Sequence, residues 1–223
     1  MDFRHELKHE ITYSDMLTIR QRLSAIAKPD IHAVHGRYLI RSLYFDTPTD
    51  KALREKIDGV SRREKFRIRY YNDNLSVIYL EKKSKLAGLG QKQKAPLTTE
   101  EAQAIVDGQL EWMTDSRYPL IQELYHKIKT QGLSPKTIVD YMREPFIYVP
   151  GNVRITLDYN IRTGLNCIDF LNPNCITIPA GNFVYIMEVK WDAFLPGVIR
   201  DAIQLQGRQS SAFSKYAACR IYG

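Results

Sequence analysis

The sequence has few cysteines and no cysteine pattern typical of a metal site. Cys167, Cys175 and Cys219 form no C-x-x-C pair, and no His stands near them at the spacing of a zinc ligand set. We therefore expect three reduced thiols and no zinc site. The five histidines, at positions 5, 9, 32, 35 and 126, form no ligand cluster along the chain.

Long apolar runs are also absent. No segment approaches the roughly 18 to 20 apolar residues that span a bilayer, and the opening MDFRHELKHE lacks the apolar stretch of a secretory signal. These absences predict a cytoplasmic protein without a membrane segment of its own. The sequence also has no G-x-S-x-G, no H-E-x-x-H and no P-loop, so nothing predicts a nucleophilic mechanism, a zinc protease site or a P-loop nucleotide site.

The composition is typical of a globular protein with one sizeable core. Of 223 residues, 44% are apolar and 26% are charged, which excludes a disordered chain, collagen and a coiled coil. No internal repeat, low-complexity tract or Pro/Ser-rich linker divides the sequence. We therefore predict a single domain over residues 1–223.

The net charge of +7 is concentrated in one segment. Between Lys51 and Lys94 there are thirteen Lys or Arg and five Asp or Glu, so the rest of the chain carries a net charge of −1. Such an excess indicates an anionic partner, although a charged stretch is more often a solvated face. A nucleic-acid-binding module would explain the charge as well, but no nucleic-acid motif is present and we expect no nucleic-acid partner.

The hydrophobic pattern predicts an α+β fold, with antiparallel pairing favoured by turn-like connections. Strands are expected at residues 3–12, 38–45, 65–71, 77–85, 137–148, 152–159 and 183–191. A helix is expected from its cap at Ser14 until Pro29 ends it, with Met16, Ile19, Leu23 and Ile26 at helical spacing. Further helices are expected at 50–56, at 99–107 after Thr98 or Thr99, at 118–130, and in two stretches that close the chain. Residues 85–96 are expected to form a basic loop that leads into a further strand.

Charged and apolar residues alternate in several of these strands. Arg67 and Arg69 stand two residues apart in KFRIRYY, as do Glu81, Lys83 and Lys85 in VIYLEKKSK, so each set lies on one strand face. On an open sheet this face would be ordinary surface. In a sheet that closes into a barrel, it would line a polar interior.

A second recurring unit is E-x-K on a strand. It occurs as Glu6-Leu7-Lys8, Glu81-Lys82-Lys83 and Glu188-Val189-Lys190. Arg and Lys side chains suit phosphate oxygens. Carboxylates in a basic site make sense as ligands of Mg²⁺ or Mn²⁺, which bridge carboxylate and phosphate oxygens. The pattern therefore predicts phosphate chemistry with a divalent metal.

In content and order, these segments resemble the triphosphate tunnel metalloenzymes, and within them the polyphosphate polymerase branch, the vacuolar transporter chaperone (VTC) domains. The resemblance rests on RHELKHEI, RSLYFDTP, DGVSRREKFRIRYY, YLEKKSK, GQKQKAPL, YMREPF, VRITLD, YIMEVK and FSKY. It implies an antiparallel eight-stranded β-barrel, the triphosphate tunnel, with surrounding helices. It also implies transfer of the ATP γ-phosphate onto a polyphosphate chain, with Mn²⁺ or Mg²⁺ as cofactor and ATP, inorganic polyphosphate or triphosphate as partners. Whether a membrane-protein partner receives the product is left open.

The resemblance also assigns roles to residues. The expected phosphate-binding residues are Lys8, Arg67, Arg69, Lys83, Lys94, Arg143, Arg154, Lys190 and Lys215. Six of these are expected to act in catalysis, namely Lys8, Arg67, Arg69, Lys83, Lys190 and Lys215. The expected metal ligands are Glu188, Glu6 and Glu81. Triphosphatases and cyclases of this group open with E-x-E-x-K, and Arg4 in place of the first glutamate favours the polymerase branch.

Two other functions remain open at this point, an inorganic triphosphatase and a non-catalytic polyphosphate-binding module. Several residues also have ordinary structural interpretations. Arg62 and Arg63 are expected at the surface, and Arg41 is equally consistent with pairing to a nearby carboxylate and with a tunnel position. Tyr44, Tyr70 and Tyr141 are expected to be core aromatics with hydrogen-bonded hydroxyls, and Lys82, Lys85 and Lys92 are left unassigned.

Overall fold

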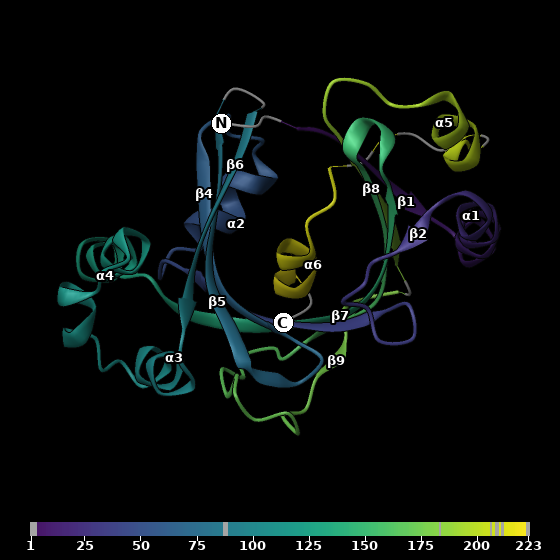
Figure 1. Cartoon of the computed structure of the whole chain (residues 1–223). Coiled ribbons are helices and arrows are strands. Elements are labelled where there is room, and N and C mark those ends of the chain that lie inside the picture. The colour runs from purple at the N-terminus through teal and green to yellow at the C-terminus, as the bar shows by residue number, and fades with distance from the viewer. Residues whose placement is uncertain are drawn as a thin grey trace. The chain divides into compact units, whose positions relative to one another are not determined.

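The computed structural model describes residues 4–86, 89–182, 184–205, 207, 210 and 212–221 (Figure 1). Its strands are β1 (His5–Ile11), β2 (Lys28–Pro29), β3 (Tyr38–Asp46), β4 (Arg63–Tyr71), β5 (Asn74–Leu86), β6 (Leu89–Leu97), β7 (Ser134–Tyr148), β8 (Val153–Thr163), β9 (Ile178–Pro179) and β10 (Tyr185–Trp191). Its α-helices are α1 (Tyr13–Ile26), α2 (Lys51–Ile57), α3 (Thr99–Val106), α4 (Pro119–Gln131), α5 (Gly197–Ile203) and α6 (Lys215–Ile221). Short 3₁₀ helices cover Glu111–Asp115 and Pro150–Asn152.

The strands are hydrogen-bonded in the order β1-β10-β8-β7-β3-β4-β5-β6, with β2 added on β7 and β9 on β8. The strand pairs whose register is described are all antiparallel. The predicted α+β class with eight main antiparallel strands is therefore confirmed. The expected strand at 3–12 is β1, and residue 3 lies outside the described residues, as does residue 183 before β10.

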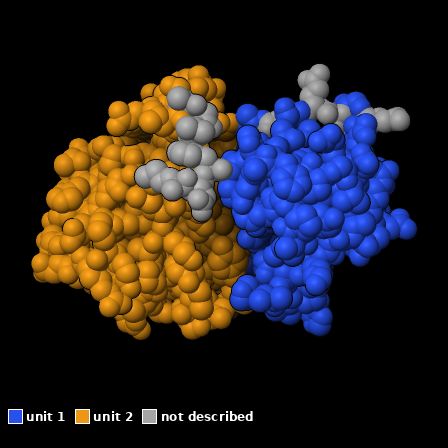
Figure 2. Space-filling view, turned by 45° about the horizontal axis from the view of Figure 1, so that its top comes forward, with its two compact units in different colours: residues 1–39, 141–161, 181–213 blue, residues 40–140, 162–180, 214–223 orange. Residues whose placement is uncertain are grey.

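The chain divides into two compact units (Figure 2). Unit 1 comprises residues 1–39, 141–161 and 181–213, and unit 2 comprises residues 40–140, 162–180 and 214–223. The long strands β7 and β8 contribute residues to both units. The single domain over residues 1–223 stays a prediction.

In unit 1, α1 and α5 lie on the same side of β1 and β8 (Figure 1). The helical period places Met16, Ile19 and Leu23 on the buried side of α1, as the sequence predicts. They pack in a core with apolar residues of β8 and β10, such as Ile155 and Val189. Because strand side chains alternate, the other face of these strands is left for polar residues.

The cap of α1 differs from the prediction. Thr12, not Ser14, is the N-cap residue. The Thr12 hydroxyl accepts from the Asp15 amide at 3.2 Å, and the Asp15 carboxylate accepts from the Thr12 amide at 2.9 Å. This reciprocal capping box satisfies two amides at the start of the helix, which Ser14 could not do from inside the first turn.

In unit 2, the apolar face of β4 and β5 carries the core. Phe66, Ile68 and Leu80 are at most 1% exposed and pack with buried residues of α3 and α4, which lie beside β5 in Figure 1. Asn72 and Asp73 connect β4 to β5 with φ of 52° and 53°. Two successive positive φ values are typical of the type I′ turn, which joins β4 and β5 in a hairpin.

The basic loop expected over residues 85–96 is largely wrong. Lys85 and Leu86 extend β5, and residues 89–97 form β6. The two strands pair in continuous register from Ile78↔Leu97 to Leu86↔Leu89. The Gly and Lys content suggested a loop, but a polar sequence forms a strand readily when its neighbour supplies a full ladder of hydrogen bonds. Residues 87 and 88 lie outside the described residues.

The helices are short for membrane segments. The longest is α1 with 14 residues, whereas a helix needs about 20 to cross a bilayer. In the part of the chain that the structure describes, no helix is both long and apolar enough to span a membrane. The cytoplasmic location stays a prediction.

Candidate functional site

The first charged cluster lies on the strand face of unit 2 that is opposite to its apolar core. Arg67 pairs with Tyr44 on β3 and with Glu81 on β5. Arg69 pairs with Ser42 on β3. Residues that pair across a ladder share a face, so these side chains leave the sheet on the same side. These side chains share a face because charged and apolar residues alternate along the strands, as predicted.

Arg67 is fixed by three hydrogen bonds. Its Nε and Nη2 donate to Oε2 of Glu81 at 2.8 and 2.6 Å, and its Nη1 donates to the hydroxyl oxygen of Tyr44 at 2.7 Å. Glu81 is 2% exposed and also forms an ion pair with Lys92. Burial alone would raise the pKa of Glu81, but Arg67, Arg69 and Lys92 hold it well below its ordinary value. Glu81 is therefore an ionised counter-charge within a basic surface.

Tyr44 is buried beneath the same cations. Its ring lies 5.5 Å from the Arg67 guanidinium carbon and stacks on Tyr216 of α6 at a centroid distance of 5.0 Å. Burial would raise the pKa of Tyr44, but the nearby charges of Arg67, Lys65 and Arg69 lower it to about 8. Tyr44 is therefore a buried aromatic with a hydrogen-bonded hydroxyl, as expected, and the charges around it are positive.

Positive charge is in excess across this face. Lys83 pairs with Lys65 on β4 and with Lys92 on β6, and Lys94 pairs with Glu81 and lies 4.8 Å from the ring centroid of Tyr79. The alternate positions Lys65, Arg67 and Arg69, together with their partners on β5 and β6, thus hold six cations and one carboxylate. Like charges directly opposite each other destabilise a sheet, so a polyanion bound here would relieve the repulsion. We call these residues the basic face.

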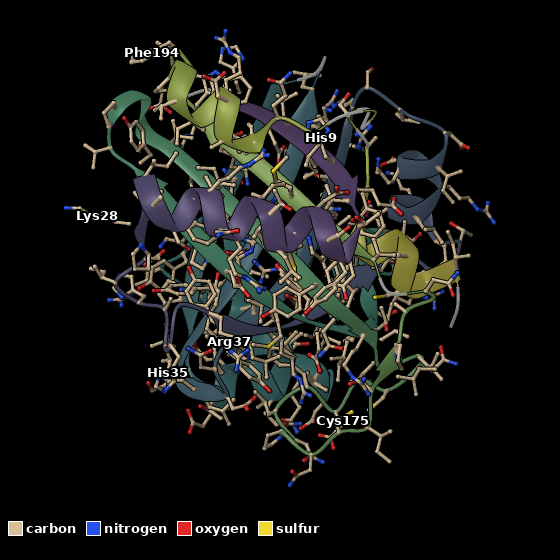
Figure 3. The ribbon with its side chains drawn as sticks, turned by 90° about the vertical axis from the view of Figure 1, so that its right-hand side faces the viewer. His9, Lys28, His35, Arg37, Cys175 and Phe194 are labelled. Carbon is tan, nitrogen blue, oxygen red and sulfur yellow. The ribbon has the colours of Figure 1, made fainter. Side chains whose placement is uncertain are left out.

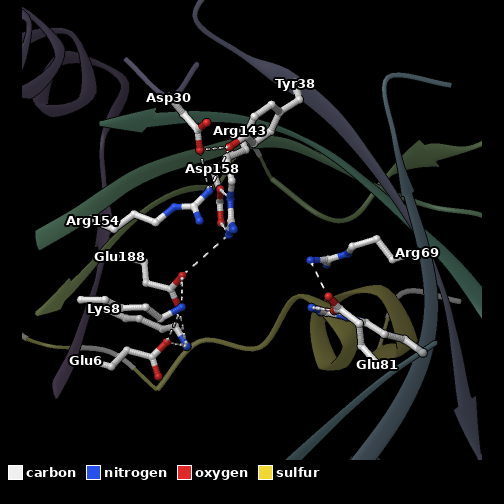
Figure 4. Close-up of polar contacts among 12 residues, drawn as sticks. Glu6, Lys8, Asp30, Tyr38, Arg69, Glu81, Arg143, Arg154, Asp158 and Glu188 are labelled. Carbon is white, nitrogen blue, oxygen red and sulfur yellow. Dashed lines mark hydrogen bonds and ion pairs between the residues drawn. The ribbon is translucent and has the colours of Figure 1, made fainter. Parts of the chain in front are cut away.

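A second cluster lies on the polar face of unit 1 (Figure 4). Lys8 pairs with Glu188, and Glu6 pairs with Lys190, across β1 and β10. On the other side of β10, Glu188 pairs with Thr156 of β8. The alternation of E-x-K on both β1 and β10 places these charges on one face, while Leu7 and Val189 pack on the opposite face. We call this set the carboxylate cluster.

Glu188 is the centre of this cluster. Its Oε1 lies 3.1 Å from Lys8 Nζ, and its Oε2 accepts from Lys190 Nζ at 3.0 Å and lies 3.7 Å from Arg143 Nη2. The residue is 5% exposed. Burial would raise the pKa of Glu188, but a hydrogen bond with Glu6 and the charges of Lys190, Lys8 and Arg143 hold it well below its ordinary value. Glu188 is therefore ionised across the physiological pH range.

The arginines of the carboxylate cluster have carboxylate partners of their own. Arg143 forms a bidentate pair with Asp158, at 2.6 and 2.7 Å. Arg154 donates from Nη2 to Tyr38 at 2.9 Å and to Asp30 at 3.2 Å. The four cations Lys8, Arg143, Arg154 and Lys190 thus stand against the four carboxylates Glu6, Asp30, Asp158 and Glu188. In contrast to the basic face, this cluster is balanced in charge.

Two of the predicted metal ligands suit a hard divalent cation. Glu6 and Glu188 lie on paired strands within hydrogen-bonding reach of each other. The hydroxyl of Thr156, which pairs with Glu188, is buried and has no hydrogen-bond partner among the described residues. Mg²⁺ and Mn²⁺ prefer such oxygen donors, and Mg²⁺ is commonly held by one or two carboxylates together with substrate phosphates. The residues therefore fit the metal that the resemblance implies.

The protein alone does not complete the coordination shell of such an ion. Across the described ranges, no group of three or more His, Cys, Asp or Glu side chains is arranged to hold a metal ion. Glu81, the third predicted ligand, belongs to unit 2 and accepts from Arg67 and Lys92. Its metal role stays a prediction. Two carboxylates from the protein leave the remaining positions for substrate or water oxygens.

A family comparison agrees with the sequence motifs. The model described as "VTC domain" matches residues 3–221, which is nearly the whole chain. The chain belongs to the VTC domain family. The resemblance inferred from the motifs is thereby confirmed, and no curated protein matches the sequence.

Solved structures with some similarity to this chain share little sequence with it. The VTC domain is similar to the PH1012 protein from Pyrococcus horikoshii OT3, with 11% identity and a TM-score of 0.51 over 99% of each chain. It is also similar to a candidate adenylate cyclase from Bacillus halodurans, with 16% identity and a TM-score of 0.47 over 85% of this chain and 80% of that one. At identities this low, the similarity to the PH1012 protein indicates a shared fold and nothing about activity.

Among the predicted site residues of the VTC domain, Lys215 is on a helix. It is the first residue of α6 and is half-buried. Next to it, Tyr216 donates to Asp46 at 2.6 Å, and Arg220 pairs with Asp50 at 3.0 Å. These contacts fasten α6 to β3 and to the start of α2. They fix the position of Lys215 in unit 2.

Arg41 and Lys82 have structural partners. Arg41 is 4% exposed and donates to both carboxylate oxygens of Asp140, at 2.9 and 2.8 Å. It pairs with Tyr70 of the apolar face, so it leaves the sheet opposite to Arg69. Lys82 lies on the same apolar side and forms an ion pair with Glu64 at 3.2 Å. Of the two interpretations of Arg41, pairing with a carboxylate is the one that the structure supports.

Sequence reasoning missed several supporting residues. Ser42 accepts from Arg69 Nε at 2.9 Å, and the Asp30–Tyr38 pair supports Arg154. Ser42 and Tyr44 alternate in RSLYFD, and this spacing could have indicated their face. No sequence signal points to Asp30, because it lies 124 residues from Arg154.

The charged clusters are distinct from the apolar cavity of unit 1. This cavity, of about 570 Å³, is lined by Leu7, Met187, Trp191, Phe194 and Leu205 among others. Leu7 and Met187 are on the strand face opposite to Lys8 and Glu188. The cavity therefore does not open onto the carboxylate cluster.

Proposed function

We propose that this VTC domain is a divalent-metal-dependent polyphosphate polymerase, which transfers the γ-phosphate of ATP onto the end of a polyphosphate chain. The observation that carries the proposal is the basic face of unit 2, where six cations surround one carboxylate on three adjacent strands. A linear polyanion with a charge on every phosphoryl group matches a row of cations along strands.

The chemistry of the basic face suits phosphate more than other anions. Arginine forks such as that of Arg69 bind two oxygens of a phosphoryl group at once, and the compact ammonium groups of Lys83 and Lys94 add charge without fixed geometry. Charge stabilisation and positioning are most of what phosphoryl transfer requires of a protein. The lack of a nucleophile motif in the sequence agrees with direct transfer between phosphates.

The carboxylate cluster would hold the metal. Glu6 and Glu188 are the proposed ligands, and a bound Mg²⁺ or Mn²⁺ would supply neutralisation of the charge on phosphate oxygens. Lys8, Lys190 and Arg143 now pair with Glu188. In the proposed function these three side chains bind phosphate oxygens and orient the phosphoryl group. Arg154, held by Tyr38 and Asp30, is the fourth phosphate-binding residue of this cluster.

Two other reactions are compatible with a basic phosphate site, an inorganic triphosphatase and binding without turnover. Arg4 disfavours the triphosphatase, because it forms an ion pair with Asp192 at 2.8 Å where the hydrolases of this group have a glutamate. ³¹P NMR with ATP, Mn²⁺ or Mg²⁺ and a short polyphosphate primer separates the three. New mid-chain phosphate signals support the polymerase, orthophosphate alone supports the triphosphatase, and an unchanged spectrum despite triphosphate binding leaves only a binding module.

The metal assignment has a separate test. Glu188→Gln keeps the size of the side chain and removes its charge, so we expect loss of turnover with tripolyphosphate binding largely retained in calorimetry. Manganese binding, followed by EPR, should weaken in the same variant. Glu111→Gln is the matched control, because the Glu111 side chain is exposed and forms a surface ion pair with Lys129. Full turnover in Glu188→Gln would exclude Glu188 as a ligand.

A further inference from the structure

Two cysteine sulfurs lie in close contact in unit 2. Cys167 Sγ and Cys175 Sγ are 2.7 Å apart, and both residues are half-buried free thiols. They belong to the segment 164–177 between β8 and β9, where Figure 3 shows Cys175 in the green loop at the lower edge of the molecule. A disulfide bond is about 2.05 Å long, so a small movement would join the two sulfurs.

The backbone of this segment is held in the shape that brings the sulfurs together. The Cys167 amide donates to Gly164 at 2.8 Å, and the Cys175 amide donates to the Asn172 carbonyl at 3.1 Å. The same Asn172 carbonyl accepts from buried Arg41 at 2.6 Å. Between the two cysteines, Phe170 is 1% exposed and packs on Tyr70 at 4.9 Å. The two thiols are therefore positioned by the core and not by chance contact on a loose loop.

We propose that Cys167 and Cys175 form a reversible intramolecular disulfide by exchange with a small disulfide such as oxidised glutathione. Nothing in the proposed phosphate chemistry uses these residues, so this inference stands independently of the proposed function. Cys219 takes no part, because it is fully buried in α6 and its thiol faces the carbonyl of Arg162 at 3.6 Å.

The exchange proceeds in two balanced steps. The thiolate of Cys167 attacks one sulfur of glutathione disulfide, which forms a mixed disulfide and releases one glutathione thiolate. The Cys175 thiol then loses its proton to that thiolate or to water and attacks the Cys167 sulfur, which releases the second glutathione. The protein loses two hydrogens as two thiols become one disulfide, and the reagent gains them as two thiols.

The order of attack follows from the surroundings of the two thiols. Burial, together with the neighbouring Cys167 sulfur, raises the pKa of Cys175 to about 12. Cys175 is thus a poor first nucleophile at neutral pH and acts as the resolving thiol once a mixed disulfide stands beside it. The bond would close a short loop whose two ends already touch, so we expect a higher melting temperature with the fold unchanged.

The experiment treats the purified full chain with oxidised glutathione and counts free thiols after denaturation. We expect the three thiols to fall to one and the intact mass to fall by two hydrogens. Cleavage before Asp169, which lies between the two cysteines, should give fragments that stay joined until reduction. Dithiothreitol should restore three thiols.

Serine variants identify the partners. Cys167→Ser and Cys175→Ser should each prevent the loss of two hydrogens, whereas Cys219→Ser should retain it. Three free thiols after oxidation, a stable glutathione adduct without ring closure, or a bond that involves Cys219 would each overturn the proposal. The wild-type mass map decides the question even if a serine variant folds poorly.

Discussion

Arg67 and Glu81 lie opposite each other on β4 and β5, and the Arg67 guanidinium donates twice to one oxygen of Glu81, at 2.8 and 2.6 Å. Both residues are less than 10% exposed. Glu81 is the only carboxylate among the strand positions that define the basic face. Its pair with Arg67 links it to one of the six cations of that face. Glu81 therefore lowers the repulsion among cations in the free protein and fixes the orientation of an arginine predicted to bind phosphate.

Glu81→Gln should destabilise the protein by about 3 kcal/mol or more, because loss of one partner leaves a buried charge uncompensated. Urea unfolding at pH 7 measures the change. The control is Glu111→Gln, whose ion pair is exposed and whose loss should alter the free energy of unfolding by no more than about 0.5 kcal/mol. Equal effects in the two variants would contradict a buried pair.

The same pair predicts how stability depends on acid. The pKa of Glu81 is held well below its ordinary value in the folded state, so the unfolded state binds the proton first. Its contribution is fully present above the unfolded pKa, near 4.5, and is lost progressively as pH falls toward the folded pKa. The difference in unfolding free energy between wild type and Glu81→Gln should therefore shrink from pH 7 to pH 3. A constant difference over that range would show that the Glu81 pKa is not lowered.

Tyr44 predicts a second pH dependence of stability, with the same sign but in the alkaline range. Its pKa of about 8 lies below the ordinary value of 10, so the folded state favours the phenolate. The stabilisation is complete above pH 10 and is lost as pH falls through 8. Relative to Tyr44→Phe, the wild type should gain unfolding free energy on the order of 2 kcal/mol between pH 7 and pH 10. Absorbance at 295 nm should show one tyrosine that titrates near pH 8 in the wild type and not in the variant.

The helices and strands that could be predicted are those in which buried residues recur at a regular spacing. Met16, Ile19 and Leu23 recur at helical spacing because they face a core, and Phe66 and Ile68 alternate with arginines for the same reason. A strand was expected here, but most of the residues of β6 were assigned to the loop before it, because the stability of β6 comes from pairing with β5 and not from its own residues. The cap at Thr12 was misplaced by two residues because Ser14 and Thr12 are chemically similar caps, and only the backbone distinguishes them.

The site could be predicted where charge alternates within one strand, and not where partners come from distant segments. Arg67, Glu81 and Glu188 are visible in E-x-K and R-x-R units. The partners of Arg154, by contrast, are Asp30 and Tyr38, which precede it by 124 and 116 residues. The contrast between a basic face and a charge-balanced cluster depends on cross-strand register, which the sequence alone does not specify.

The Arg41–Asp140 pair allows a structural role to be separated from a phosphate-binding one. Both side chains are at most 5% exposed and lie on the apolar side of the sheet. Asp140→Asn should cost about 3 to 5 kcal/mol of stability because Arg41 stays buried without its counter-charge. Tripolyphosphate affinity, measured by calorimetry at a temperature where the variant is folded, should be unchanged. A large loss of affinity with normal stability would instead place Arg41 among the phosphate ligands.

The basic face has excess positive charge and the carboxylate cluster is balanced, so Lys83→Met and Lys8→Met should change the free energy of unfolding in opposite directions. Lys83 pairs with a lysine on each side, so Lys83→Met should raise the stability of the ligand-free protein by a few tenths of a kcal/mol, through relief of like-charge repulsion. It should also weaken tripolyphosphate binding, by about tenfold, and flatten its salt dependence.

Lys8→Met should act in the other direction on stability. Lys8 lies 3.1 Å from Glu188, which is 5% exposed, so the variant leaves a buried carboxylate with less compensation and should lower the free energy of unfolding. Urea unfolding in low salt without phosphate measures both variants on one scale. If both lysines prove stabilising to the same extent, the basic face carries no excess charge in solution. Anion binding would then have to derive from the arginines alone, and Arg69→Met should abolish it.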